Sequence, residues 1–486
     1  MKKIVIVIVH CIIVSCSSFA QTFEAGSIEF KSSDTALQNA FQSAKKMALY
    51  YRGKPSDPVG PWYESALPPR YAFCMRDVAH QCLGAEILGL QLENKNMFEL
   101  FAKNISESKD WCSYWEINKY GKPAPEDYRN DKEFWYNLNA NFDIINACWR
   151  IYLWTGDKRY INGANFLNFH KRSVDDYIKR WTLQPDSLLK RLPHPNAPVP
   201  FNINDAFHRS RGLPSYVESV ENLKMGIDLV AALYSGLKTY SFMLTESGNK
   251  REAKLYESSA ESYRKSIDSF WWDKRDNLYF TYYTNEGKFE KNEGETFLLW
   301  FDALKDSVRV RKTIEHLLSR NWNIENLSYF PYLLSKYGYW KEAYNYILLL
   351  TDNGTKRREY PEVSFGVLQG IVLGLMGVEA DARYNRITTI FRSSSETTAE
   401  LDKLPVLKTL IKVKHEGTKA TQFFNKGKYP VIWRVKFSGD YPYLYDNGKP
   451  IVARQERDWE GHIFSFADFT VNPGIKKSIS AVNRIK

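Results

Sequence analysis

The stretch that decides the fold is Gly212–Leu237, GLPSYVESVENLKMGIDLVAALYSGL. From Val217 onward its apolar residues recur with the 3.6-residue period of a helix face, and the opposite side is also mostly apolar or small. This period predicts a helix over residues 217–237. Because a helix that is apolar nearly all round is buried among other helices, we expect a layered, mainly helical protein.

Two carboxylates, Glu218 and Glu221, lie in the first turn of this predicted helix. Acidic residues near a helix N-terminus are stabilised by the helix dipole, which is one explanation for both. The other explanation is that they are catalytic acids at the mouth of a cleft. The rest of the chain has to decide between the two.

Twelve stretches before residue 377 have helical periodicity. They are expected at residues 34–51, 77–90, 96–106, 139–154, 158–181, 217–237, 250–271, from 295, 307–318, from 328, 340–350 and 362–376. The second, sixth and twelfth are mostly apolar and small, whereas the fifth, seventh and eleventh carry many charges. This alternation predicts an (α/α)6 toroid, with six helices in an inner ring and six outside. An irregular helical bundle is the alternative.

The character of the sequence changes after Gly377. Stretches that alternate or are rich in β-branched residues follow, separated by Gly, Pro and Asn, as is typical of short strands. They are Ile387–Phe391, Leu407–Lys414, Tyr429–Ser438, His462–Thr470 and Ser478–Val482. We therefore predict a helical domain over residues 30–384 and a small antiparallel β domain over residues 385–486.

The first twenty residues indicate export. Two lysines precede an apolar run that ends in small residues, the pattern of a bacterial signal peptide. Residues 13–16 resemble a lipoprotein cleavage box with Cys16 as the lipidated residue, and residues 18–20 offer an ordinary cleavage site instead. We expect a periplasmic protein or an outer-membrane lipoprotein of a Gram-negative bacterium, with the membrane reached only through that anchor.

The distribution of charge limits the kinds of molecule that the protein is expected to bind. The net charge is +11, but Lys and Arg are spread along the chain, which argues against nucleic acid and suits an anionic glycan such as a uronate. A generic basic exported protein is the alternative.

Cysteines 74, 82, 112 and 148 are expected either to form disulfides or to stay free and buried. No metal or cofactor is expected, because His80 and His208 lack ligand spacing and no GxGxxG, GK[ST] or GxSxG motif occurs. The oligomeric state is not predicted.

If the helices alternate, the starts of all even-numbered helices meet at one rim. Acids, arginines, amides and aromatic residues are concentrated at these starts, as in a carbohydrate cleft. The expected substrate-binding residues are Arg76, Asp77, Trp135, Tyr136, Asn137, Tyr216, Tyr329 and Tyr360. These side chains supply stacking rings and polar groups around a sugar.

Glycoside hydrolysis needs two carboxyl groups on either side of the scissile bond. Glu218 and Glu359 belong to the starts of the sixth and twelfth helices, which face each other across a six-hairpin ring. We predict them as the catalytic pair, at the wider separation of an inverting enzyme. The rival carboxylates are Glu221, Glu293, Glu295, Glu362 and Asp205.

Over residues 35–380 the chain resembles the six-hairpin glycosidase superfamily, which includes glucoamylases, trehalases, processing α-glucosidases and α-L-rhamnosidases. The resemblance is carried by Arg76-Asp77, by the run from Tyr329 through YFPYLL and YGY, and by Arg358-Glu359-Tyr360. It implies a general base at Glu359 and an acid at Glu218. The chain departs from the trehalases in having GLPSY at residues 212–216 where they have a Ser-Gly-Trp-Asp motif.

Three functions follow, in order of preference. The first is an inverting glycoside hydrolase that acts on an oligosaccharide derived from a plant, algal or host polysaccharide. The second is a toroid polysaccharide lyase acting on a uronate polymer, for which Tyr136, Asn137, Tyr216 and His208 are available. The third is a glycan-binding lipoprotein without catalytic activity.

Overall fold

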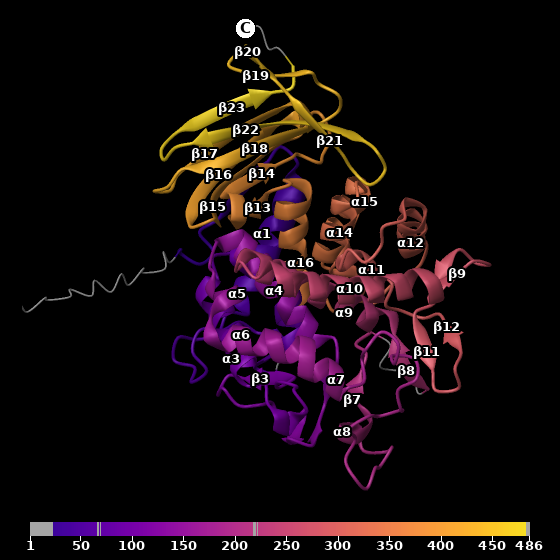
Figure 1. The fold of residues 1–486 in the computed structure, drawn as a ribbon. Helices are drawn as coiled ribbons and strands as arrows, with labels where there is room; N and C mark the ends of the chain where they lie inside the picture. The colour runs from indigo at the N-terminus through magenta and orange to yellow at the C-terminus, as the bar shows by residue number, and fades with distance from the viewer. Residues whose placement is uncertain (1–22, 66–67, 69, 217–219, 221, 483–486) are drawn as a thin grey trace, which may run out of the picture.

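The structure is a computed structural model that describes residues 23–482, except 66–67, 69, 217–219 and 221. The predicted signal peptide with Cys16, and the predicted acids Glu218 and Glu221, lie outside the described residues. Figure 1 shows a helical part with two β-sheets at one end of it and a group of loops at the other. None of the described helices combines the length and apolarity needed to span a membrane.

Helices occupy the chain from residue 35 to residue 375 in the predicted order, and the last of them continues from residue 369 as a π-helical segment over Gly370–Leu375. The longer ones are α1 (Thr35–Tyr50), α2 (Met75–Ile87), α3 (Gln91–Lys103), α4 (Ala140–Thr155), α6 (Ala164–Arg172), α9 (Ile227–Glu246), α10 (Lys250–Phe270), α12 (Ser307–Ser319), α15 (Trp340–Thr351) and α16 (Pro361–Gln369). The short ones are α5 (Arg159–Asn162), α7 (Ile178–Arg180), α8 (Ala206–Arg209), α11 (Thr296–Trp300), α13 (Ile324–Leu327) and α14 (Phe330–Lys336).

The apolar helices form an inner layer. Along this layer α11 packs on α9, α9 on α4, α4 on α2, α2 on α16, and α16 on α14. Trp300 of α11 and Tyr329 at the start of α14 are in ring contact, with centroids 5.0 Å apart, so the two ends of the series also meet. Charged helices cover the layer from outside: α10 packs on α9, and α15 packs on α14.

Three predicted helices were wrong in their extent. The helix predicted over 96–106 begins five residues earlier, as α3 (Gln91–Lys103). The helix predicted over 217–237 begins only at Ile227, because Met225 and Gly226 form strand β8 (Leu223–Gly226) and pair with β11 (Tyr282–Thr284). The helix predicted over 158–181 is broken at Gly163, whose backbone is extended with φ −65° and ψ 145°, and continues through a π-helical turn over Ser173–Tyr177. A short apolar run fits a strand or a helix equally well until its partners are known.

Two sheets follow the helices. Among the described residues, one has the strand order β1-β15-β16-β17-β23-β19-β20 and the other β13-β14-β18-β22-β21, with β14–β18 as the parallel pair. Their bounds are β1 (Glu29–Ser32), β13 (Glu379–Asp381), β14 (Arg386–Thr389), β15 (Thr398–Val406), β16 (Thr409–Glu416), β17 (Ala420–Asn425), β18 (Val431–Ser438), β19 (Tyr443–Asp446), β20 (Lys449–Val452), β21 (Arg454–Arg457), β22 (Ile463–Val471) and β23 (Lys476–Ser480). Phe423 and Trp433 stack between the sheets with ring centroids 5.2 Å apart.

Both sheets include strands from before residue 385, where the sequence predicts the β domain to start. β1 comes from the N-terminal end of the chain and pairs antiparallel with β15, and β13 directly follows the helices. A strand of four residues such as β1 has too little alternation to be recognised, and its place is set by its partner.

The loops at the end opposite the sheets contain short strands. They are β2 (Ala72–Cys74), β3 (Glu116–Asn118), β4 (Tyr128–Asn130), β5 (Glu133–Phe134), β6 (Tyr136–Asn137), β7 (Arg211–Leu213), β9 (Trp272–Asp273), β10 (Leu278–Tyr279) and β12 (Phe289–Glu290), beside β8 and β11. The pairing of β6 with β7 holds the segment before Ser215 against the start of α4. β2 leads directly into α2 and pairs with β3.

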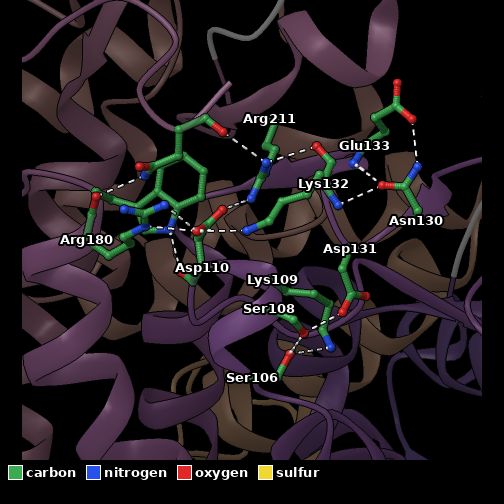
Figure 2. A network of polar contacts seen from close by, with 12 residues as sticks. Ser106, Ser108, Lys109, Asp110, Asn130, Asp131, Lys132, Glu133, Arg180 and Arg211 are labelled. Carbon is green, nitrogen blue, oxygen red and sulfur yellow. Dashed lines mark hydrogen bonds and ion pairs between the residues drawn. The ribbon is translucent and has the colours of Figure 1, made fainter. Parts of the chain in front are cut away.

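A buried carboxylate ties three of these loops together. Asp110 accepts hydrogen bonds from Arg211, from Arg180 at 2.8 Å and from Lys132 at 3.3 Å (Figure 2). Arg211 is almost fully buried and also donates to the main-chain carbonyl of Lys132 at 2.9 Å. The ion pair therefore joins the segment after α3, the segment around β5 and the segment that leads into β7.

The cysteines follow one of the two predicted alternatives. Within the described part of the chain, Cys74, Cys82, Cys112 and Cys148 are free and buried. Burial raises the pKa of the Cys82 thiol to about 12, so it behaves as a small apolar side chain.

Gly377 connects the inner helices to the sheets, and its replacement by alanine should destabilise the protein. Its φ is +56°, and a Cβ atom there would lie 1.9 Å from the carbonyl oxygen of Ile390. We expect Gly377→Ala to cost about 2–4 kcal/mol of unfolding free energy, since a backbone clash adds to the strain of a left-handed residue. Gly248→Ala is the matched control: φ is +87° but no atom lies within 4 Å of the added Cβ, so about 1 kcal/mol is expected. Equal losses in urea unfolding would show that the Ile390 contact is unimportant.

Candidate active site

The starts of the inner helices are connected through Asp228, in the first turn of α9. Its Oδ2 accepts a hydrogen bond from the Asn139 side chain at 3.0 Å, and from the main-chain N–H groups of Ser215 at 3.0 Å and Tyr216 at 3.2 Å. Burial raises the pKa of Asp228, and the hydrogen bonds from these donors oppose the rise. Asp228 therefore holds the segment before β8 at the start of α4.

Tyr216 is placed by this segment among three other helix starts. Its ring stacks on Phe297 of α11 with centroids 3.8 Å apart, and the guanidinium of Arg76 lies 4.9 Å from the same ring. Its hydroxyl is 2.9 Å from the hydroxyl of Tyr329. Arg76 and Asp77 are in the first turn of α2, so predicted residues from three parts of the sequence meet here, together with Phe297.

A narrow cavity opens beside this cluster. Its walls are formed by side chains from α2, α11, α14 and α16 and the segments that lead into them. They are His80, Gln81, Trp300, Ser328, Tyr329, Tyr332, Glu362, Gly366 and Gln369. Aromatic rings, amides and one carboxyl group are the residue types that bind a sugar through stacking and directed hydrogen bonds.

Glu362 is the carboxyl group of the cavity wall. It lies in the first turn of α16, and its pKa is raised well above that of a free glutamate, first by burial of the carboxyl and then by the charge of Asp77. Arg76 lowers this pKa only in part. Asp77 is itself paired with Arg76 at 3.5 Å, and Glu325 with Arg357 at 3.6 Å. Glu362 therefore keeps its proton where an ordinary glutamate has lost it, as a general acid must.

Glu359, predicted from the sequence as a catalytic residue, has a different environment. Its side chain is exposed, and its main-chain carbonyl accepts a hydrogen bond from the hydroxyl of Tyr51. It precedes α16, whereas its rival Glu362 is inside the helix. Its predicted partner Glu218 and the rival Glu221 lie outside the described residues.

Two other rivals have partners of their own. Glu295 is buried and lies 3.2 Å from the Nε2 atom of His316. Glu293 accepts a hydrogen bond from the Asn326 side chain at 2.9 Å, and burial raises its pKa. Both are at the start of α11, and neither is among the residues that line the cavity.

The remaining rival, Asp205, belongs to a cluster with Glu133 and His208, whose possible ligand atoms all lie within 4.8 Å of one another. Arg129 pairs with both carboxylates at 3.0 Å, and Nε2 of His208 donates to Glu133 at 3.0 Å. Asp205 also caps α8 by accepting from the N–H of Phe207. A guanidinium that bridges the two acids suits an ion-pair network in the loops better than a cation site.

Of the predicted substrate-binding residues, Arg76, Asp77, Tyr216 and Tyr329 come together as described. Tyr136 and Asn137 are instead fully buried: the Tyr136 hydroxyl donates to Asn141, and the Asn137 amide donates to the carbonyl of Pro214 at 3.2 Å. They hold loops in place and have no exposed surface for a ligand.

Trp135 and Tyr360 are partly buried and pack against the core. The guanidinium of Arg357 lies 4.8 Å from the Tyr360 ring. Neither residue is among those that line the cavity.

Several cavity residues were not predicted. His80 was interpreted as structural, and Trp300, Tyr332 and Gln369 were not singled out. Helical spacing could have found two of them, since His80 is four residues after Arg76 and Tyr332 is three after Tyr329, on the same helix faces. Trp300 and Gln369 have no comparable signal, because a buried Trp or Gln in an apolar helix fits a core equally well.

Comparisons with known proteins bear on the fold of the chain. A trehalase family model matches residues 211–329, from β7 to Tyr329. An α-L-rhamnosidase from Dictyoglumus thermophilum has a similar structure over 94% of this chain and 50% of its own, with 14% identity and a TM-score of 0.61. No curated protein sequence matches the chain.

Two further structures are similar. A GH78 family rhamnosidase of Bacillus sp. GL1 matches 83% of this chain and 41% of its own, with 14% identity and a TM-score of 0.58. A putative kojibiose phosphorylase from the human microbiome matches 92% of this chain and 63% of its own, with 11% identity and a TM-score of 0.55. The chain thus spans about half the length of the rhamnosidases. Its fold is that of the six-hairpin glycosidases, the superfamily that its sequence resembles.

Proposed function

We propose that the protein is a glycoside hydrolase, with an (α/α)6 toroid, that acts by inversion on an oligosaccharide derived from a polysaccharide. The observation that carries the proposal is Glu362, a carboxyl group with a raised pKa in the wall of an aromatic cavity at the starts of the inner helices. The order of helix contacts in the inner layer, and the contact between its ends, support the toroid.

The chemistry assigned to the site uses the proton of Glu362. A protonated carboxyl group can donate to the leaving oxygen of a glycosidic bond while a second carboxylate activates water on the other face of the sugar. Trp300 and Tyr332 in the same wall offer rings for stacking. Glu218, the acid that the resemblance implies, takes the role of this second carboxylate in the proposal, on the sequence ground that it lies two residues after Tyr216.

Two alternatives have different support. A lyase is disfavoured, because Tyr136 and Asn137 are core residues and His208 belongs to the Arg129 ion-pair network. Phosphorolysis has one specific observation in its favour, the similarity to a putative kojibiose phosphorylase over 92% of the chain. In that reaction phosphate would take the place of water.

One assay separates these functions. The protein is incubated with neutral and uronate oligosaccharides and aryl-glycosides, with and without phosphate, and the first product is followed by proton NMR. We expect release of sugar without phosphate, with the inverted anomer formed first and no unsaturated product that absorbs ultraviolet light. Release that requires phosphate would indicate a phosphorylase, and binding without release would leave a glycan-binding protein.

We also propose export, on the evidence of the first twenty residues alone. Fractionation of expressing cells is expected to find the protein in the envelope, and replacement of Cys16 by Ser to release it from the membrane if residues 13–16 are the cleavage box. An unchanged membrane fraction would contradict the lipid anchor.

A further inference from the structure

Three buried polar side chains and the partly buried Tyr216 form an unbroken hydrogen-bonded series beside the cavity. Oδ1 of Asp143 is 3.3 Å from Nε2 of His80, and Nδ1 of His80 contacts the hydroxyl of Tyr329. The Tyr329 hydroxyl is in turn 2.9 Å from that of Tyr216. Asp143 is 3% exposed, His80 5% and Tyr329 8%, so water does not compete with these bonds. The series joins α4, α2, the start of α14 and the segment before β8.

The charges of these groups set the direction of every bond. An ionised carboxylate only accepts, so Nε2 of His80 carries the hydrogen and donates it to Asp143. In a neutral imidazole the other nitrogen is then an acceptor, and the Tyr329 hydroxyl donates to it. Burial raises the pKa of Tyr329 and of Tyr216, which keeps both phenols protonated. Tyr216 therefore donates to the Tyr329 oxygen, and all the protons point toward Asp143.

The His80 ring is held in this orientation by its neighbours. It packs edge-on against Trp300 with centroids 5.4 Å apart and stacks on Phe297 at 5.8 Å. Its main-chain carbonyl accepts a hydrogen bond from the Gln369 amide at 2.9 Å. Both ring nitrogens are thus engaged and the ring is packed on two sides, so its nitrogens cannot exchange places without opening the cavity wall.

We propose that His80 is a positioning residue that makes the Tyr329 hydroxyl a hydrogen-bond acceptor toward the cavity, so that this hydroxyl favours the hydroxyl groups of a neutral sugar over a carboxylate or sulfate. A phenol has one hydrogen and two lone pairs. The hydrogen goes to His80 and one lone pair to Tyr216, which leaves a lone pair for the ligand. A carboxylate or sulfate has only acceptors, so at this hydroxyl it would meet another acceptor. The inference rests on the proposed function and argues against the anionic substrate that the net charge suggests.

The variant Asp143→Asn tests the direction of the hydrogen bonds in this series. In the Ser-His-Asp triad the same change keeps the geometry but imposes the wrong histidine tautomer. Here Nδ1 would gain the hydrogen and donate to Tyr329, whose own hydrogen would then face the cavity. Asp157→Asn, just beyond the other end of α4 and paired with Arg159, is the matched control.

Two measurements are made on the full chain. In protein with ¹⁵N-labelled histidine, long-range NMR correlations, assigned with His80→Gln, should show hydrogen on Nε2 in the parent and in Asp157→Asn, and on Nδ1 in Asp143→Asn. Dissociation constants for a neutral sugar and its uronate should favour the neutral sugar in the parent. That preference should fall about 10-fold or more in Asp143→Asn, since one hydrogen bond to a buried group is reversed.

Hydrogen on Nδ1, or on both nitrogens, in the parent at pH 7 would overturn the inference. The inference would also be overturned if Asp143→Asn showed the expected tautomer but kept the parent's preference for the neutral sugar over its uronate. His80 would then have only a structural role, in holding the helices together. If the parent binds a neutral sugar with this preference but cleaves nothing, the proposed hydrolysis fails and the inference stands.

Discussion

Replacing Glu362 by glutamine is expected to lower kcat about 10²–10⁴-fold, the contribution of a positioned general acid. Glutamine has nearly the same shape but no proton to give to the leaving oxygen. Among the described residues that line the cavity, Glu362 is the one that carries a carboxyl group. Initial rates on the substrate found in the oligosaccharide screen measure the loss.

Glu359→Gln is the matched control, since the two residues are three positions apart and Glu359 is exposed. Its kcat should stay within about 2-fold of the parent, the range of a surface substitution remote from the chemistry. A large loss in Glu359→Gln with full activity in Glu362→Gln would transfer the role to Glu359, as the sequence resemblance implies.

The same variant changes how stability depends on pH. The pKa of Glu362 is raised on folding, so the folded protein holds a proton that the unfolded chain loses above its ordinary pKa of 4.5. The contribution of Glu362 to the stability of the parent is therefore lost as the pH rises from about 4.5 through the raised pKa. Glu362→Gln should match the parent near pH 4 and be more stable near pH 9. A difference in unfolding free energy between the two proteins that does not change over this interval would contradict the raised pKa.

Replacing Asp110 by asparagine is expected to cost about 3–5 kcal/mol of unfolding free energy, because it leaves the buried guanidinium of Arg211 without its counter-charge. Arg211 is 1% exposed, and Arg180 and Lys132 donate to the same carboxylate (Figure 2). Urea unfolding at pH 7 measures the change.

Two further variants show whether the buried charge is the cause. The ammonium of Lys132 belongs to a side chain that is 55% exposed, so Lys132→Met should cost less than about 1 kcal/mol. The double variant Asp110→Asn/Arg211→Met should regain part of the loss, since no unpaired charge remains. If the loss in the double variant equals the sum of the losses in Asp110→Asn and in Arg211→Met alone, the pairing of Asp110 with Arg211 does not explain the effect.

The helices with one apolar face were predicted closely. α1, α10, α12 and α15 begin within two residues of their predicted starts, because their amphipathic pattern and caps are local: Asp34 accepts from the N–H of Leu37. β1 and β8 were missed, because four residues of strand acquire their conformation from a partner far along the chain.

The candidate site was predicted in part for the same reason. Residues at the starts of helices could be placed at one rim, and Arg76, Asp77, Tyr216 and Tyr329 do meet there. The sequence favoured Glu359 over its rival Glu362, whereas Glu362 is the one that lines the cavity. The two lie three residues apart, in the loop and in the first helical turn, and the pattern of the sequence does not fix where between them the helix begins.

The sequence by itself determined the helical inner layer, the change to β-structure near residue 380 and the rim where polar residues gather, since periodicity and composition act over neighbouring residues. Only the tertiary structure decided which groups share a hydrogen bond. His80 meets Asp143 and Tyr329 across 63 and 249 residues of chain. Whether a histidine is a core residue or sets the proton on a tyrosine depends on such distant partners, because a side chain's protonation and direction follow from what surrounds it in space.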